Sequence, residues 1–410
     1  MGRTPFVLRA SRVAKLLGCI ALAALPFLGF GQALTVTDPL PKIQFDPWKA
    51  IPSDENTLEY TESFPSAIQS PYPENNVVPL HIMIPAQNSG PMPAVIVLHY
   101  WGATDLQVEE ELARELNDHG MAAVIMTLPY HLSRTPKGSR SGKMAVGSDV
   151  AALVQTMTQS VLDVRRSLDF LETRPEFDHS RFGVAGISLG SIVASIAFGV
   201  DDRIKQGALL LGGADLAHII WHSSRTGAVR EELRHRGYTE ARLRIELNPV
   251  DALRFLPSRH GENALVVGGK YDTVMPRADT QKLIDALPGA QVLWLDTGHY
   301  GGVFVEKRLL RTAAEFFAKR FAGQAYAAPK HVYAPTLRLG AIADTSSGLQ
   351  LGAGIDLFKP NPKSHFLSTI IVTPKGLNLF AGFLLGQGLA VGGFATPQRV
   401  SVGAWWSIVL

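Results

Sequence analysis

The chain has 410 residues, of which 18% are charged, and its formal net charge is only +3. This length can hold about two or three domains with a large core. Because no cluster of Lys and Arg stands beside aromatic side chains, the charge pattern argues against a nucleic-acid partner. The single cysteine, Cys19, rules out an intramolecular disulfide and a cysteine-based metal site.

The first 33 residues have the pattern of a secretory signal peptide. Basic residues from Arg3 to Lys15 precede an apolar run over 16–30, which is short for a membrane span. Small residues then offer a cleavage site after Ala33. The pattern predicts export to the periplasm or the outside of the cell, with an uncleaved anchor helix as the alternative.

A proline-rich, polar segment over 34–76 predicts an extended leader with a strand near 57–64, and regular alternation of strands and helices follows over 77–324. Short, wholly apolar runs are typical of strands buried on both faces of a parallel sheet. The alternation predicts an α/β fold with a doubly wound, mostly parallel sheet. Residues 213–262 break the pattern and predict a small helical cap insertion. The predicted strands are 77–84, 94–98, 121–126, 182–185, 208–211, 264–267 and 292–295, and the predicted helices are about 108–116, 150–172 and 303–321.

Residues 186–190 read Gly-Ile-Ser-Leu-Gly, a G-x-S-x-G pentapeptide between an apolar run and a helix-compatible segment. A serine at such a sharp turn has a strained backbone, and side chains larger than glycine at the flanking positions would collide. The turn lifts the hydroxyl of Ser188 out of the sheet, and the helix N-terminus behind it favours developing negative charge. Alone, the pentapeptide also fits a glycine-rich turn without catalytic function. Whether Ser188 is a nucleophile therefore depends on the presence of partner residues.

Two candidate partners follow the last two predicted strands. A serine nucleophile requires a base within hydrogen-bond distance and an acid that orients the base. Asp272 and His299 both come directly after a strand, so they lie at the same sheet edge as Ser188. Asp296 and Asp251 are weaker candidates for the acid, because one is only three residues from His299 and the other precedes the strand concerned.

The loop after the strand 94–98 is a candidate for half of an oxyanion hole, which needs two backbone N–H groups. One is expected from Leu189, and the other from Trp101, with Tyr100 as the alternative. Tyr100 is also a candidate to contact substrate. Arg134, after the strand 121–126, reaches the same edge and could hold a carboxylate or phosphate, although a solvated loop arginine is the alternative reading.

These motifs make the chain over roughly 77–322 resemble the α/β-hydrolase superfamily, and within it the dienelactone-hydrolase-like and acetyl-xylan-esterase-like serine hydrolases. The chain departs from dienelactone hydrolases in having Ser188 where they carry cysteine, and from many prolyl-oligopeptidase-like peptidases in having Ser191 where they carry glycine. The resemblance implies hydrolysis of a small-molecule or carbohydrate ester through an acyl-enzyme. In that reaction Ser188 attacks, His299 takes its proton and Asp272 stabilises the imidazolium.

Two other functions remain open, a peptidase or acyltransferase on the same fold and a catalytically idle or anchoring protein. The sequence contains neither an H-E-x-x-H spacing nor a glycine-rich phosphate loop, so we expect neither a metal nor a cofactor.

Residues 325–410 have a different pattern, in which apolar residues alternate with small or polar ones. This period of two predicts antiparallel strands, and their length approaches that of a membrane β-strand. About four to six strands fit the segment, whereas closed membrane barrels start at about eight. The sequence therefore predicts a glycine-rich β module that is either soluble and packed on the hydrolase, or part of an oligomeric or outer-membrane barrel.

Overall fold

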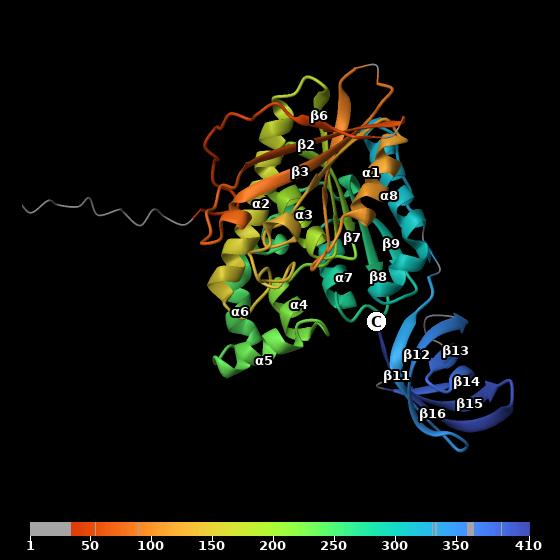
Figure 1. The fold of residues 1–410 in the computed structure, drawn as a ribbon. Helices are drawn as coiled ribbons and strands as arrows, with labels where there is room; N and C mark the ends of the chain where they lie inside the picture. Colours follow the sequence, from red (N-terminus) through yellow and green to blue (C-terminus); the bar gives the residue numbers. More distant parts are fainter. Residues whose placement is uncertain are drawn as a thin grey trace, which may run out of the picture. The chain divides into compact units, whose positions relative to one another are not determined.

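The computed structural model describes residues 34–53, 55–88, 90–329, 331–332, 334–358, 365–386 and 388–410. The predicted signal peptide over 1–33 lies outside them. These residues form a ten-stranded sheet covered by helices, followed by a closed six-stranded barrel (Figure 1). Among the described helices, none combines the length and the apolar character that crossing a bilayer requires.

The strands of the large sheet are β1 (Lys49–Ile51), β2 (Thr57–Pro65), β3 (Val77–Pro85), β4 (Met92–Leu98), β5 (Ala122–Met126), β6 (Phe177–Ile187), β7 (Ile204–Leu210), β8 (Ala264–Gly269), β9 (Gln291–Leu295) and β10 (His331–Val332). Their order is β1-β2-β3-β5-β4-β6-β7-β8-β9-β10. The pairs from β1 to β5 are antiparallel, and every pair from β5 to β10 is parallel. The predicted α/β class and mostly parallel sheet are confirmed.

The sheet begins earlier in the chain than residue 77. β1 and β2 come from the segment over 34–76, for which the sequence predicts an extended leader with a strand near 57–64. That strand is present as β2, and it pairs with β3 along its whole length. The buried positions of β2 include Thr57 and Glu62 as well as Phe64. Because two of these buried side chains are polar, the apolar pattern of β2 is weaker than that of the central strands.

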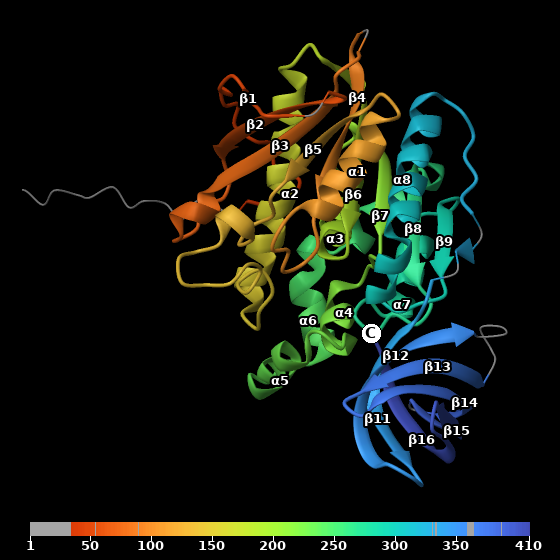
Figure 2. The same cartoon turned by 45° about the vertical axis from the view of Figure 1, so that its right-hand side comes forward.

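Helices cover both faces of the sheet, and they are α1 (Gln107–Asn117), α2 (Val150–Glu172), α3 (Leu189–Val200), α7 (Arg277–Asp285) and α8 (Glu306–Phe321). On one face α1 and α8 lie side by side (Figures 1 and 2) and contribute Leu112 and Phe316 to a buried cluster. On the other face α2, α3 and α7 contribute Val161, Phe198 and Leu283 to a second cluster. The two clusters bury both surfaces of the parallel strands, which explains their wholly apolar sequences.

The segment 213–262 contains three short helices, α4 (Leu216–His222), α5 (Gly227–His235) and α6 (Glu240–Leu247), grouped together in Figure 2. Side-chain caps start two of them. The Asp215 carboxylate accepts a hydrogen bond from the His218 backbone N–H at 3.1 Å, and the Thr239 hydroxyl accepts one from the Arg242 N–H at 3.2 Å. Such caps satisfy N–H groups that have no acceptor within the helix.

The C-terminal barrel consists of β11 (Leu337–Asp344), β12 (Gly348–Phe358), β13 (Phe366–Thr373), β14 (Gly376–Gly386), β15 (Leu389–Thr396) and β16 (Arg399–Val409). Neighbouring strands are antiparallel, and β11 pairs with β16 to close the barrel. Close approach of the strands requires glycine. A Cβ at Gly382 would lie 2.3 Å from the Val391 carbonyl oxygen, and one at Gly392 would lie 2.2 Å from that of Ala381. The antiparallel module predicted for this segment is confirmed as a closed barrel of six strands.

Candidate active site

Ser188 occupies the turn between β6 and α3 with φ of 55° and ψ of −112°, a conformation that non-glycine residues rarely adopt. The glycines on either side are required by space. A Cβ at Gly186 would lie 2.2 Å from the Gly190 carbonyl oxygen, and a Cβ at Gly190 would lie 2.3 Å from that of Leu98. The strained serine between two crowded glycines is the geometry expected of a nucleophile elbow.

The structure brings Ser188, His299 and Asp272 into one hydrogen-bonded chain. Nε2 of His299 lies 3.0 Å from Oγ of Ser188, and Nδ1 of His299 lies 2.7 Å from Oδ2 of Asp272. The other Asp272 oxygen accepts backbone N–H groups of Val274 and Met275 at 2.9 and 2.7 Å. All three side chains are buried, so the carboxylate holds the imidazole in a fixed orientation toward the serine.

The two weaker candidates for the acid have other contacts. Asp296 forms an ion pair with Lys270. Asp251 accepts the backbone N–H of Leu216 at 2.7 Å and that of Leu253 at 2.9 Å, so it fixes the start of α4. Asp272 is therefore the carboxylate that orients the imidazole.

The loop after β4 is held in place by His99. Its Nε2 accepts the Leu128 backbone N–H at 3.0 Å, so Nδ1 carries the proton that is donated to the Tyr100 carbonyl oxygen at 2.9 Å. Burial lowers the pKa of His99 to about 3, which keeps the ring neutral. Leu189 is the first residue of α3, so its N–H has no acceptor within the helix.

A cavity of about 350 Å³ opens at Ser188 and His299. Besides Ser188 and His299, four polar side chains line it, namely Tyr100, Arg225, Tyr300 and Glu306 at the start of α8. Its apolar wall consists of Val108, Ile187, Leu210, Leu211, Val303, Leu309 and Leu310. An apolar cavity of this size with a few polar groups suits a small ligand.

Comparison with known proteins agrees with this architecture. Residues 56–205 match the family described as "Alpha/beta hydrolase domain containing 18". The structure superposes on an acetyl xylan esterase from Paenibacillus sp. R4 with a TM-score of 0.53 and 21% identity, covering 66% of this chain and 87% of that one. For acetyl xylan esterase 1 from Thermoanaerobacterium sp. the TM-score is 0.51 and the identity 17%, covering 67% and 88%. The chain has the α/β-hydrolase fold. At these identities, the two solved structures show the shared fold.

Two curated relatives of this chain come from Mycobacterium tuberculosis, one from strain CDC 1551 and one from strain H37Rv, and both are named as uncharacterized proteins. Each is 25% identical over 227 residues, which is 54% of this chain and 52% of the relative. The chain thus spans about half the length of the curated relatives it matches.

Arg225, which sequence reasoning missed, lies in the insertion over 213–262 and lines the cavity. Its guanidinium donates to the Tyr300 hydroxyl and to the Trp101 carbonyl oxygen, both at 3.0 Å, and lies 4.7 Å from the centre of the Trp101 ring. These contacts join the insertion to the loop after β4 and to the residue after His299. No local pattern around Arg225 predicts them, because its partners are far away in sequence.

Arg134 does not line this cavity, which corrects the sequence-based prediction that it contacts substrate. Its side chain is fully buried, pairs with Asp163 at 2.9 Å and donates to the carbonyl oxygens of Thr127 and Asn75 at 2.9 and 2.7 Å. The guanidinium therefore holds three chain segments together. The alternative of a solvated loop residue is excluded by the same burial.

Glu109 on α1 is a second group that the sequence did not single out. Its carboxyl group is fully buried, and neither oxygen has a hydrogen-bond partner in another described residue. The pKa of Glu109 is raised to about 8, chiefly because the carboxyl group is buried. The negative charges of Asp105 and Glu306 raise the pKa further, and the backbone N–H of Glu109 lowers it only in part. At neutral pH the group is therefore protonated, close to the Glu306 side of the cavity.

Among the described residues, one group brings metal-ligating atoms within 4.8 Å of one another, namely His218, His222 and Glu240. Each has a partner already. Nδ1 of His218 lies 2.8 Å from Asp279, Nε2 of His222 lies 3.0 Å from Glu240, and Glu240 also accepts from Arg244 at 2.7 Å. Each of the three side chains therefore has a protein partner within hydrogen-bond distance.

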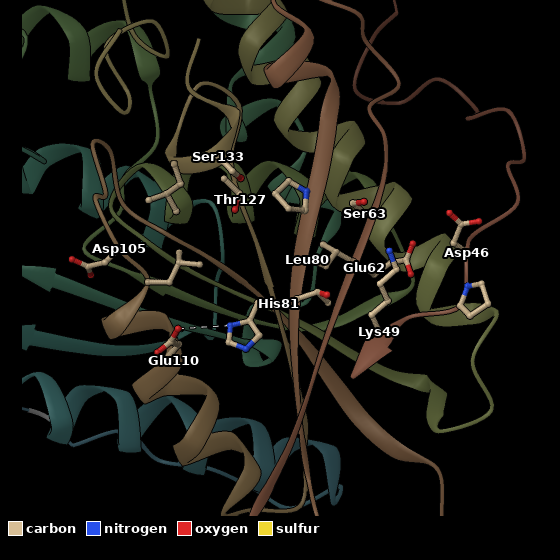
Figure 3. Close-up of a pocket in the computed structure, with 15 residues that line it drawn as sticks. Asp46, Lys49, Glu62, Ser63, Leu80, His81, Asp105, Glu110, Thr127 and Ser133 are labelled. Carbon is tan, nitrogen blue, oxygen red and sulfur yellow. Dashed lines mark ion pairs between the residues drawn. The ribbon is translucent and has the colours of Figure 1, made fainter. Parts of the chain in front are cut away.

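A second cavity, of about 550 Å³, is lined by residues of β1 to β3 and of the start of α1 (Figure 3). His81 lies in its wall, with Nε2 at 2.7 Å from Glu59 and Nδ1 at 3.7 Å from Glu110. Its described lining residues include none of the hydrogen-bonded chain around Ser188. We therefore place the candidate active site at the smaller cavity, where the strained serine and its base are found.

Proposed function

We propose that the protein is a serine hydrolase that cleaves carboxylic esters through an acyl-enzyme. The observation that carries the proposal is the hydrogen-bonded chain from Ser188 through His299 to Asp272, which opens into a cavity with an apolar wall. A serine hydroxyl bonded to an oriented imidazole is the arrangement that nucleophilic catalysis requires. Small-molecule or carbohydrate esters are the substrate class that the cavity supports.

The reaction follows from the positions of these atoms. Oγ of Ser188 attacks the ester carbonyl carbon while Nε2 of His299 accepts the hydroxyl proton, and Asp272 stabilises the imidazolium. The N–H of Leu189 and an N–H of the loop after β4, from Trp101 or Tyr100, stabilise the oxyanion. His299 then protonates the leaving alcohol. A water molecule, deprotonated by His299, attacks the acyl-enzyme, releases the carboxylic acid and restores the Ser188 hydroxyl.

Turnover of p-nitrophenyl esters of increasing acyl length tests the proposal. Ser188→Ala is expected to lower kcat/KM by at least about a thousandfold, because it removes the nucleophile. Ser191→Ala is the matched control, since its hydroxyl is buried in the first turn of α3, just after Ser188, and has no hydrogen-bond partner among the described residues. This variant should stay within a few-fold of the parent.

Three results would count against an ester-cleaving serine enzyme. Full activity in Ser188→Ala would remove the assigned nucleophile. A parent that turns over no ester and is not labelled by a fluorophosphonate would favour the idle or anchoring alternative. Faster turnover of peptide anilides than of esters would favour a peptidase.

We also propose that the enzyme is exported to the periplasm or the outside of the cell. The support is the basic start and short apolar run within residues 1–33. The N-terminal sequence of the protein isolated from cells tests this, since removal of the signal predicts a chain that begins at Leu34. A chain that retains the apolar run would favour the anchor-helix alternative.

A further inference from the structure

The outer face of the C-terminal barrel is apolar on all six strands. Large exposed apolar side chains include one or more from each strand, and Leu351 is 73% exposed. Soluble proteins rarely expose contiguous apolar areas of this kind, and where they occur they mark contact with a partner or a membrane. Examples in strand order from β11 to β16 are Leu339, Leu351, Val372, Phe383, Val391 and Val402.

Charged side chains avoid this outer face. The described parts of the six strands contain four charged residues. Arg338 and Asp356 are buried inside the barrel, whereas Asp344 and Arg399 lie at strand ends beside the turns. The outer face of the described strands therefore forms an apolar belt without charges, and charged residues occur only at the strand ends and turns that border it.

The polar groups of the strands are directed inward. Nε of Arg338 donates to both Asp356 oxygens at 2.9 and 3.0 Å, and the Thr369 hydroxyl donates to the same carboxylate at 2.9 Å. The rest of the interior is an apolar cluster of Ile342, Leu367, Ile371, Phe380, Ala390, Phe394 and Trp405. A barrel built for water would place its charged groups outside, so a charged pair inside and an apolar outer face are the distribution expected in lipid.

Half of the barrel strands reach the length that a bilayer requires. β12, β14 and β16 have 11 residues each and β11, β13 and β15 have 8 each, whereas a tilted membrane strand needs about 9–11. The closed ladder leaves no unpaired edge, which a hydrocarbon environment demands. A second copy of the chain would cover only one side of the barrel, whereas lipid surrounds all six strands.

We propose that the barrel β11–β16 inserts in a lipid bilayer and holds the α/β-hydrolase domain at the membrane. The number of strands is below the eight of known bacterial barrels. In a barrel this narrow the interior is filled by side chains such as Trp405, so the module acts as an anchor and not as a channel.

Flotation of the full-length protein with vesicles of phosphatidylethanolamine and phosphatidylglycerol tests the proposal. The protein is expected to float with the vesicles and to resist extraction by carbonate. Leu351→Lys places a charge in the apolar belt and should lower the floated fraction at least tenfold. Ile245→Lys is the matched control, because Ile245 is 76% exposed but lies on α6, and it should float like the parent.

A conservative variant keeps the test decisive if Leu351→Lys does not fold. Trp406 is exposed on the outer face of β16, so brominated acyl chains should quench tryptophan fluorescence, and Trp406→Phe should remove most of that quenching. The proposal is overturned if the parent stays with the soluble fraction, if it forms a discrete dimer without lipid, or if the two lysine variants float equally. Esterase activity is not the readout, so the outcome is independent of the proposed reaction.

Discussion

The buried carboxyl group of Glu109 links the stability of the fold to pH. Burial raises its pKa from 4.5 to about 8, so between these values the folded state retains a proton that the unfolded state has lost. Stability therefore falls as pH rises through this window, by up to about 1.4 kcal/mol per pH unit. Glu109 makes its full contribution to stability below pH 4.5, the pKa of this group in the unfolded state. The contribution is lost completely above about pH 8, the pKa of the group in the folded state.

Glu109→Gln should remove this dependence, because an amide is neutral at every pH. We expect the free energy of unfolding of the variant, relative to that of the parent, to increase as the pH rises from 5 to 8.5. Chemical denaturation at pH 5, 7 and 8.5 measures the difference. Glu111→Gln, on the half-buried side of the same helix, is the control and should follow the parent. Parallel curves for Glu109→Gln and the parent would contradict the assignment.

At the residue scale, the sequence can predict the positions of side chains that directly follow a strand. Ser188, Asp272 and His299 could be proposed together because each follows a parallel strand, and such strands end at one edge of the sheet. Arg225 and Arg134 could not be assigned in this way. The partners of Arg225 depend on the path of an insertion, and the burial of Arg134 depends on an acid that is 29 residues away on α2.

At the scale of elements, Asp251 connects the insertion to the active site. Its carboxylate holds the start of α4 through the N–H of Leu216, and α4 leads within three residues of its end to Arg225. Asp149 provides a comparable cap for α2, accepting the Ala152 N–H at 3.0 Å, but α2 carries none of the residues that line the smaller cavity. A comparison of Asp251 and Asp149 variants can therefore distinguish an effect on stability alone from an effect on the active site.

Asp149→Ala should lower the free energy of unfolding by about 1 kcal/mol, the usual cost of losing a cap. Asp251→Ala should lower it by more, because its buried carboxylate accepts the N–H groups of both Leu216 and Leu253. Only Asp251→Ala should also raise KM for p-nitrophenyl esters, because it loosens the segment that positions Arg225. Denaturation and steady-state kinetics on both variants measure the two effects. Equal KM values in the two variants would show that α4 does not position the site.

The central elements could be predicted because apolar runs of β4, β5 and β8 are continuous, and α2 has the predicted bounds. Other elements could not. β1 has three residues and β10 has two, which is too short for any periodicity to be recognised. Closure of the barrel depends on the pairing of β11 with β16, a contact between strands that are distant in sequence.

On the scale of the whole molecule, the C-terminal module contacts the loops that carry the base and the acid. The Thr297 hydroxyl donates to the Pro335 carbonyl oxygen at 2.8 Å, just before β11. The Thr273 hydroxyl, next to Asp272, donates to the Val409 carbonyl oxygen at 3.2 Å. The barrel is therefore more than an appendage to the hydrolase, because its two ends support the loops on both sides of the imidazole–carboxylate pair.

Gly298, the residue before His299, tests whether this support matters for catalysis. A Cβ at Gly298 would lie 2.1 Å from the Leu410 carbonyl oxygen, so Gly298→Ala must displace either the C-terminus or the loop with His299. We expect kcat to fall about tenfold with little change in KM, since a small displacement of the base slows proton transfer more than binding. A chain that ends at residue 409 and carries Val409→Ala should tolerate the alanine and recover most of the activity, because it removes both the Leu410 carbonyl oxygen and Cγ1 of Val409, which would lie 2.7 Å from the new Cβ. Gly147→Ala, which has open space around it, is the control. If the shortened chain does not rescue Gly298→Ala, the C-terminus is not what constrains the loop.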